Sequence, residues 1–249
     1  MKTFNDSVVI ITGAAQGIGE ATAERMAALG GKIVILDLNL AGAEAVALRL
    51  SHNGCEAIAV QADISKFEDI QKAVRQVMGR YGRIDILVNN VGWTETHPFM
   101  EEDEGYWDKI ITINLKGPIL FSKAVLPYMI EKGYGKIVNV ASEAGRIGSV
   151  GEVVYSAAKG GLITFTKALA REVARHKINV NCVCPGPTKT PLMRNQPEKI
   201  VEAITRITPL RRLAEPSEVA DAIIFFCSPQ SNFVTGEIMS VSGGLTMVG

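Results

Sequence analysis

The sequence lacks the features that would place its 249 residues in several large classes of protein. Its 26 basic and 26 acidic side chains balance, so charge gives no reason to expect a nucleic-acid or acidic-membrane partner. We find no apolar run of about 18 residues that could cross a membrane, and the first six residues lack the apolar core of a signal peptide. We therefore expect a cytoplasmic protein without membrane contact.

Cysteine and histidine are also scarce. None of the four cysteines and three histidines has the spacing of a metal or redox site, so we predict no metal. We expect Cys182 and Cys184 to point to opposite faces of one strand, and all four cysteines to be reduced packing thiols. The length fits one domain, residues 1–249, which is large enough for a full hydrophobic core.

Short apolar runs rich in β-branched residues alternate with helical segments along the whole chain. We predict strands at residues 8–11, 33–37, 57–61, 84–88, 136–140, 178–183 and 238–241, and the longest helices at 104–131 and 153–175. This alternation predicts an α/β fold, a single doubly wound Rossmann domain whose seven-stranded parallel sheet carries helices on both faces. Ligands of such sheets bind along the carboxyl ends of the strands.

A glycine-rich turn follows the first predicted strand. It runs from Thr12 to Gly19 and leads into a predicted helix that begins at Glu20. The glycines permit a tight turn and let the backbone approach a pyrophosphate at the positive end of the helix. A glycine-rich loop without a ligand is the alternative, but the flanking strands favour dinucleotide binding. The candidate cofactor-binding residues in this turn are Gly13, Gln16, Gly17, Ile18 and Gly19.

Three polar residues in the second half of the chain form a candidate catalytic group. Tyr155 and Lys159 are four residues apart, so on a helix they share one face, and Ser142 lies thirteen residues before the tyrosine. A free phenol titrates near pH 10, but a neighbouring ammonium favours the phenolate and lowers the pKa toward the range of a general base. The serine hydroxyl could hydrogen-bond a substrate oxygen opposite the tyrosine.

These motifs together resemble the short-chain dehydrogenase/reductase family over nearly the whole chain. The turn reads Thr-Gly-x-x-x-Gly-x-Gly, with three residues between its first two glycines instead of the single residue of the common dinucleotide fingerprint. Val91 departs from the family pattern, which usually has alanine there, and we expect this change to affect packing only. The other matching residues are Asp63, Asn89 to Gly92, Asn114, Ser142, Tyr155 to Lys159, Pro185-Gly186 and Thr190.

The resemblance implies a nicotinamide cofactor, and Asp37 favours NAD over NADP. A carboxylate at the end of the second strand can accept hydrogen bonds from the ribose hydroxyls and would repel a 2′-phosphate. Gln16 and Leu38, where an NADP enzyme of the family would carry a cation, are uncharged. Asp63 would hold the adenine amino group, although an ordinary loop or N-cap acid is the alternative. Further implied cofactor residues are Ile64, Asn90, Gly92, Tyr155, Lys159, Pro185, Gly186, Thr188 and Thr190.

The resemblance also assigns catalytic roles. Tyr155 would be the general base in alcohol oxidation and the acid in carbonyl reduction, while Ser142 would polarise the reacting oxygen. Lys159 would lower the pKa of the tyrosine and donate to the nicotinamide ribose. Asn114 would interrupt regular helix geometry and hold a water linked to the lysine, although a buried polar side chain bonded to the backbone is the alternative.

Closer resemblance points to the 2-hydroxycyclohexane-carboxyl-CoA dehydrogenases, which oxidise a cyclic β-hydroxyacyl-CoA. It rests on the segments 91–93, 145–149, 151–152, 184–188 and 242–247, and it implies an acyl-CoA substrate whose phosphates need cations at the pocket mouth. Residues 191–208 would form a lid with an apolar stripe, or a helix simply packed on the domain. The candidate substrate residues are Trp93, Glu143, Arg146, Ser149, Val153, Met193 and Arg194.

Other functions share most of these motifs. A 3-oxoacyl carrier-protein reductase is the main enzymatic alternative, although that group usually prefers NADPH, and a sugar-alcohol or steroid dehydrogenase is more distant. The non-enzymatic alternative is an NAD-binding regulatory protein, but such proteins commonly lose one of the catalytic residues. The resemblance further implies a homotetramer of 222 symmetry, paired through the two long helices.

Overall fold

Seven parallel strands form one sheet in the computed structural model, which describes residues 3–194 and 198–247. The spatial order is β3-β2-β1-β4-β5-β6-β7, so consecutive strands run outward in two directions from the β1/β4 pair. This arrangement confirms the doubly wound fold predicted above. The strands are β1 Val8–Thr12, β2 Lys32–Asp37, β3 Ala57–Gln61, β4 Ile86–Asn89, β5 Gly135–Val140, β6 Ile178–Pro185 and β7 Ile238–Val241.

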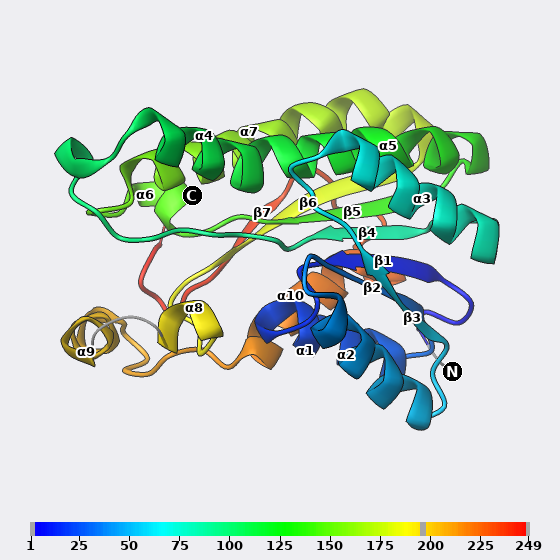
Figure 1. Ribbon diagram of the computed structural model, residues 1–249, viewed down its shortest axis with the longest axis horizontal. Helices are drawn as coiled ribbons and strands as arrows, with labels where there is room; N and C mark the ends of the chain where they lie inside the picture. The colour runs from blue at the N-terminus through cyan, green and yellow to red at the C-terminus, as the bar shows by residue number, and fades with distance from the viewer. Residues whose placement is uncertain (1–2, 195–197, 248–249) are drawn as a thin grey trace.

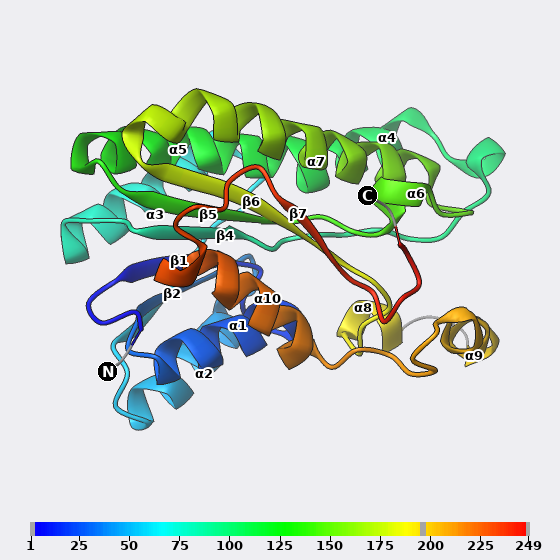
Figure 2. The ribbon, with the colours of Figure 1, turned by 180° about the vertical axis from the view of Figure 1, so that it is seen from behind.

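Helices cover both faces of the sheet. In Figure 1, α3, α4, α5 and α7 lie on one face and α1, α2 and α10 on the other, while α8 and α9 extend beyond one end of the strands. Figure 2 shows the same layers from behind. The α-helices are α1 Gly17–Ala28, α2 Leu40–His52, α3 Phe67–Tyr81, α4 Glu104–Ile111, α5 Gly117–Lys132, α6 Ala144–Ile147, α7 Val153–Val173, α8 Pro191–Arg194, α9 Glu198–Ile207 and α10 Pro216–Cys227. A π-helical segment, η2 Thr112–Lys116, joins α4 to α5, and short 3₁₀ turns lie at η1 Phe99–Glu101, η3 Ala174–His176 and η4 Pro229–Ser231.

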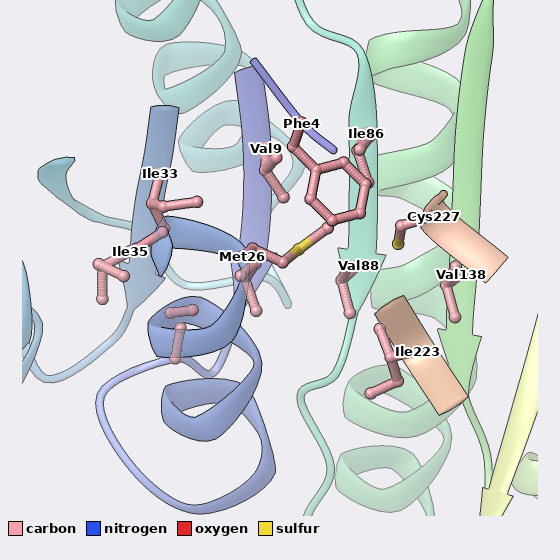
Figure 3. Close-up of a cluster of buried hydrophobic side chains, with 14 of the residues drawn as sticks. Phe4, Val9, Met26, Ile33, Ile35, Ile86, Val88, Val138, Ile223 and Cys227 are labelled. Atoms are coloured by element: carbon pink, nitrogen blue, oxygen red, sulfur yellow. The ribbon is translucent and has the colours of Figure 1, made fainter. Parts of the chain in front are cut away.

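Burial on both faces explains why the strands are almost continuously apolar. Alternate residues of β1 enter different cores: Val9 packs toward α1 and α10, and Val8 packs toward the opposite layer. Figure 3 shows the first of these clusters, where Phe4 and Met26 lie against the side chains of β1 and β4. The sheet is therefore a rigid platform, and its carboxyl ends can hold loops in fixed positions.

The prediction for Cys182 and Cys184 was wrong. Residues two apart on a strand share a face, and the two Sγ atoms lie 4.0 Å from each other in a cluster with Ala141 and Leu162. None of the four cysteines, which all lie in the described part of the chain, forms a disulfide. The pair on β6 therefore fills a small core beneath α7 and has no disulfide.

One helical run is long and apolar enough to cross a membrane when judged by length and composition alone. It covers Glu104–Lys132, with a mean hydropathy of 1.2 in its best window, so the expectation that no such run exists was wrong. In the fold this run is α4, η2 and α5, and Phe121, Val125 and Met129 of α5 pack in the core. A core helix of an α/β domain passes the same test, so the run is weak support for a membrane span.

The loops after β1 and β4 meet where the strand order reverses. The Thr12 hydroxyl accepts hydrogen bonds from the backbone N–H groups of Asn90, at 3.0 Å, and Val91, at 3.2 Å. The Asn90 side chain in turn donates to the carbonyl oxygens of Thr12, at 3.0 Å, and Gly13, at 3.1 Å. These bonds fix the two loops relative to each other.

We expect Thr12→Val to lower the free energy of unfolding by about 2 kcal/mol, because two backbone donors lose their acceptor while the side-chain shape is kept. Urea denaturation measures the change. Thr164→Val is the matched control, since Thr164 is exposed on α7 and its hydroxyl bonds only its own helix. Equal stabilities of the two variants would contradict the role given to the Thr12 hydroxyl.

Candidate active site

The predicted motif residues collect along one edge of the sheet. The glycine turn follows β1, Asp37 ends β2, and Asp63 follows β3. Asn90 and Gly92 follow β4, Ser142 follows β5, and the turn from Pro185 to Thr190 follows β6. The carboxyl ends of parallel strands share one edge, so the fold brings residues from six strands into one neighbourhood.

The turn after β1 is a cradle that only glycine can form. Gly13 and Gly17 have φ angles of 63° and 62°, in the left-handed region. A Cβ on Gly19 would lie 2.4 Å from the carbonyl oxygen of Gly13. The N-cap of α1, Gln16, makes no side-chain cap hydrogen bond, so side chains leave the first N–H groups of the helix open. Such an uncovered helix start fits the pyrophosphate of a dinucleotide.

Asp37 faces this cradle from the end of β2. Its carboxylate accepts hydrogen bonds from the backbone N–H of Ala15, at 3.1 Å, and of Asn39, at 3.0 Å. The side chains of Gln16 and Leu38 beside it are exposed. A fixed carboxylate with uncharged neighbours fits a ribose with free hydroxyls, and the residues present therefore fit a dinucleotide cofactor.

Asp63 lies in a tight turn after β3. One carboxylate oxygen accepts from both the backbone N–H and the hydroxyl of Ser65, and the other lies 3.4 Å from the Lys66 ammonium. These contacts hold the pKa of Asp63 below its usual value. The geometry is that of the loop acid considered above, and the contact with adenine stays a prediction. Ile64 is buried against Gly117 at the start of α5.

The turn after β6 lies across from the glycine cradle. A Cβ on Gly17 would be 3.5 Å from the methyl group of Thr190. The Gly186 N–H donates to the carbonyl of Val241 at 2.9 Å, and the hydroxyl of Thr188 donates to the carbonyl of Gly186 at 2.9 Å. The backbone of this turn is thus tied to β7, and Thr190 lies beside Gly17 at the start of α1.

A hollow of about 350 Å³ lies on the outer side of these two turns. Gln16, Gly17, Lys189 and Arg194 are among its lining residues. A larger hollow of about 520 Å³ lies at the opposite edge of the sheet, between α1 and α2, and none of the predicted site residues line it. The smaller hollow is therefore the one that adjoins the predicted site.

Ser142, Tyr155 and Lys159 come together between β5 and α7. Lys159 is buried, and its ammonium donates to the carbonyl of Val140 at 3.0 Å and lies 5.8 Å from the centre of the Tyr155 ring. The Ser142 hydroxyl accepts from the backbone N–H of Ala144 at 3.1 Å and also interacts with the Tyr155 phenol. The structure therefore brings the three predicted residues into one constellation.

Burial controls the protonation of this group. It raises the pKa of Tyr155 well above the usual value, the charge of Glu152 raises that pKa further, and the hydrogen bond from Ser142 opposes the shift. Burial also lowers the pKa of Lys159 to about 8. Burial is the largest cause of the shift at Tyr155, and the lowering of its pKa by Lys159 stays a prediction.

Asn114 interrupts the helix as predicted, because it lies in the π-helical segment η2. Its amide donates to the carbonyl oxygens of Trp93, at 2.8 Å, and Ile110, at 2.9 Å, and its carbonyl accepts from the Trp93 N–H at 3.1 Å. A Cβ on Gly92 would lie 3.4 Å from the side-chain oxygen of Asn114 and 3.3 Å from the Lys159 ammonium. The side chains of Asn114 and Lys159 thus both lie close to Gly92. The water that would link them stays a prediction.

The candidate substrate residues lie in different loops and helices around the site. Trp93 lies under the Lys109 ammonium, 3.4 Å from its ring centre, and Val153 is half-exposed near Tyr155. Met193 and Arg194 lie in α8, which extends beyond the carboxyl ends of the strands in Figure 1, and Ser149 lies between α6 and α7.

Arg146 requires a correction. Its guanidinium donates to the carbonyl of Ile238 at 3.2 Å and to the hydroxyl of Ser240 at 2.7 Å. These two acceptors belong to β7. The Arg146 side chain is therefore bound to that strand, and it is not placed at the pocket mouth as the predicted cation for a CoA phosphate. Lys189, another cation considered for that role, pairs with Glu215.

The predicted lid corresponds to α8 and α9. Residues 195–197 of the predicted lid lie outside the described residues, and α9 begins at Glu198. None of the residues of α9 is buried, and Ile207 of its apolar stripe is 62% exposed. Val201 and Ile204 are half-buried while Ile200 and Ile207 are exposed, so the stripe packs only in part on the domain, and closure over a ligand stays a prediction.

Sequence reasoning missed Glu152. This residue directly precedes α7, three positions before Tyr155. Burial raises the pKa of the carboxyl. The i, i+3 spacing to Tyr155 was the available signal, because residues three apart on a helix share a face.

The similarity to known proteins agrees with this site. A family model described as enoyl-(acyl carrier protein) reductase matches residues 13–246. The BbsD subunit of (2S)-[(R)-hydroxy(phenyl)methyl]succinyl-CoA dehydrogenase from Thauera aromatica is 38% identical over 244 residues, 98% of each chain. The 3-oxoacyl-[acyl-carrier-protein] reductase FabG of Escherichia coli is 37% identical over 245 residues, 98% of this chain and 99% of FabG. The crystal structure of levodione reductase matches with a TM-score of 0.92 at 32% identity, over 97% of this chain and 98% of that one.

The chain therefore belongs to the short-chain dehydrogenase/reductase family. It is an oxidoreductase that acts on CH–OH groups, and its family uses NAD or NADP.

We expect Glu152→Gln to move the pH dependence of alcohol oxidation to lower pH. The ionised carboxyl raises the pKa of Tyr155 because it disfavours a second negative charge nearby, so removing it lowers that pKa. The phenolate that accepts the proton then forms at lower pH. Initial rates across a pH series measure the shift, with Glu172→Gln, exposed on the same helix, as the control. An unchanged or higher midpoint in Glu152→Gln would contradict this coupling.

Proposed function

We propose that the protein is an NAD-dependent dehydrogenase that oxidises a cyclic β-hydroxyacyl-CoA, similar to 2-hydroxycyclohexane-carboxyl-CoA, to the β-keto thioester. The observation that carries the proposal is the meeting of Ser142, Tyr155 and Lys159 beside the cofactor cradle. The BbsD relative, which is named for a hydroxyacyl-CoA with a ring substituent, supports the substrate class. Asp37, with Gln16 and Leu38 uncharged beside it, supports NAD.

The residues of the chain divide the proton chemistry among them. NAD, which Asp37 and the glycine turn from Gly13 to Gly19 would hold, would supply the hydride acceptor for the carbinol carbon. Ser142 holds the reacting oxygen by a hydrogen bond, and the phenolate oxygen of Tyr155 takes the hydroxyl proton as the carbonyl forms. The Lys159 ammonium stabilises the phenolate electrostatically. In reduction the same phenol returns the proton.

The surroundings of the site suit an alicyclic group. Four exposed apolar side chains lie around the site. Ile147 ends α6, Val150 follows it, Leu192 lies in α8 and Ile207 ends α9. These segments lie beyond the carboxyl edge of the sheet in Figures 1 and 2. An apolar rim favours a hydrocarbon ring over a sugar, because burial of apolar surface stabilises binding. Arg194, Lys199 and Arg206 are exposed in α8 and α9 and are the cations proposed for the CoA phosphates.

The second candidate is a 3-oxoacyl-(acyl-carrier-protein or CoA) reductase. The similarity to FabG of Escherichia coli favours it, at nearly the same identity as the similarity to BbsD. An NAD-binding regulatory protein is the non-enzymatic candidate, and the full set of Asn114, Ser142, Tyr155 and Lys159 weighs against it.

We expect NAD reduction at 340 nm with 2-hydroxycyclohexane-carboxyl-CoA to be at least about tenfold faster than with 3-hydroxybutyryl-CoA, and NADP to replace NAD poorly. Tyr155→Phe is expected to lower kcat by a factor of about 100 or more, because the proton acceptor is lost. Preference for the linear thioester together with NADPH would favour the reductase instead. Unmeasurable differences between wild type and Tyr155→Phe on any alcohol or ketone would contradict an enzymatic function.

We further propose a cytoplasmic homotetramer paired through the long helices α5 and α7. Ala157 is exposed and the nearby Gly160 and Gly161 add no bulk, so this face of α7 permits the close approach of another helix. The edge strand β7 is half-exposed and offers a second contact. Sedimentation velocity should give the mass of four chains, and a monodisperse monomer would exclude the tetramer.

A further inference from the structure

Side chains of one helical run hold the loop after β4. Asn114, in the π-helical segment, pairs with both backbone groups of Trp93. Tyr106, in α4, does the same for Glu95: its hydroxyl donates to the Glu95 carbonyl at 2.7 Å and accepts from the Glu95 N–H at 3.4 Å. The two side chains thus pair with the backbone of alternate loop residues, in the way that a neighbouring strand would.

Tyr106 has a fixed position in this arrangement. Its backbone N–H donates to the carboxylate of Asp103, the N-cap of α4, at 2.8 Å. The centre of its ring lies 5.8 Å from that of the Trp93 ring and 5.4 Å from that of the His97 ring, which it meets edge to face. The helix start and the two ring contacts therefore set the point at which the Tyr106 hydroxyl meets the loop.

Both ends of the same loop lie against the catalytic group. At its far end, the His97 N–H donates to the Gly151 carbonyl at 2.9 Å, and a Cβ on Gly151 would lie 2.7 Å from the Thr96 methyl group. Gly151 comes two residues before α7, the helix that carries the catalytic tyrosine and lysine. At the near end, a Cβ on Gly92 would lie 3.3 Å from the Lys159 ammonium. The loop thus connects η2, α4 and the start of α7.

We propose that Tyr106 is a positioning residue for the reaction: its hydroxyl fixes the loop after β4, and this loop keeps Asn114 and Gly92 in place beside the catalytic lysine. Within residues 3–194 and 198–247, the Tyr106 hydroxyl is the one hydrogen-bond partner that the Glu95 backbone has outside the loop itself. Without this hydroxyl the loop is free to shift, and a misplacement of about 1 Å near the reacting atoms can slow catalysis by a factor of about 100. The role is the same whichever alcohol the enzyme oxidises.

Hydrogen–deuterium exchange of the Tyr106→Phe variant tests the effect on the loop without any substrate. Peptides that cover residues 92–97 should exchange about fivefold faster than in wild type, because the loop opens more often once the hydroxyl is lost. Peptides of β4 should be unchanged, which separates a local effect from a general loss of stability. Tyr128→Phe is the matched control, since Tyr128 is half-buried on α5 and its hydroxyl bonds none of the described residues. Exchange at the wild-type rate in Tyr106→Phe overturns the proposal.

Steady-state oxidation of 2-hydroxycyclohexane-carboxyl-CoA and 3-hydroxybutyryl-CoA tests the effect on the reaction. Tyr106→Phe should lower kcat by a factor of about 10 and leave the KM for NAD within about twofold, because the Thr12–Asn90 bonds hold the cofactor turn independently. In an Asn114→Ala background the same change should lower kcat by no more than about twofold, since both side chains act through one loop. Losses that multiply in the double variant overturn the proposal, and so does a raised KM for the alcohol with an unchanged kcat.

This inference and the proposed function can fail separately. Turnover of the linear thioester alone would sink the proposed substrate, and the kinetic comparison of Tyr106→Phe with wild type would then be made on that thioester. If neither thioester is turned over, the exchange measurement decides. Faster exchange confined to residues 92–97 then supports the role of Tyr106, and unchanged exchange overturns it.

Discussion

The network between Thr12 and Asn90 is the constraint on which the rest of the site depends. At this point the strand order reverses, so the loops after β1 and β4 leave the sheet side by side with no further strand between them. One hydroxyl and one carboxamide supply the hydrogen bonds that join these loops. The tight approach leaves no space for side chains at Gly13 and Gly19. The cofactor cradle is therefore a consequence of how the two loops are tied.

A second amide holds the same loop from the opposite side. Asn114 bonds both backbone groups of Trp93, and the π-helical segment lets its side chain enter the core while the Ile110 carbonyl keeps a donor. The loop from Asn90 to Trp93 is thus fixed at both ends, with Gly92 close to the Lys159 ammonium. The distance between the cradle and the catalytic group is set by backbone contacts, and it does not depend on flexible side chains.

Local sequence predicted the strands well because a parallel strand buried on both faces is a continuous apolar run, and β1, β2 and β3 agree with the expected ranges within one residue. The partners of individual side chains were harder to predict, since they come from distant parts of the chain. Arg146 suited a phosphate ligand by charge alone, but its partners lie about 90 residues later on β7. Glu152 was not predicted, because the burial that raises the pKa of its carboxyl depends on the fold and not on local pattern. Spacing suggested the Tyr155–Lys159 pair without indicating how deeply it is buried.

That burial sets the electrostatic character of the site. Desolvation raises the pKa values of Tyr155 and Glu152 and lowers that of Lys159. It therefore favours the neutral form of each group. Burial consequently disfavours the phenolate of Tyr155. Proton acceptance by Tyr155 then depends on positive charge near its ring, and the Val140 carbonyl holds the Lys159 ammonium 5.8 Å from the centre of that ring.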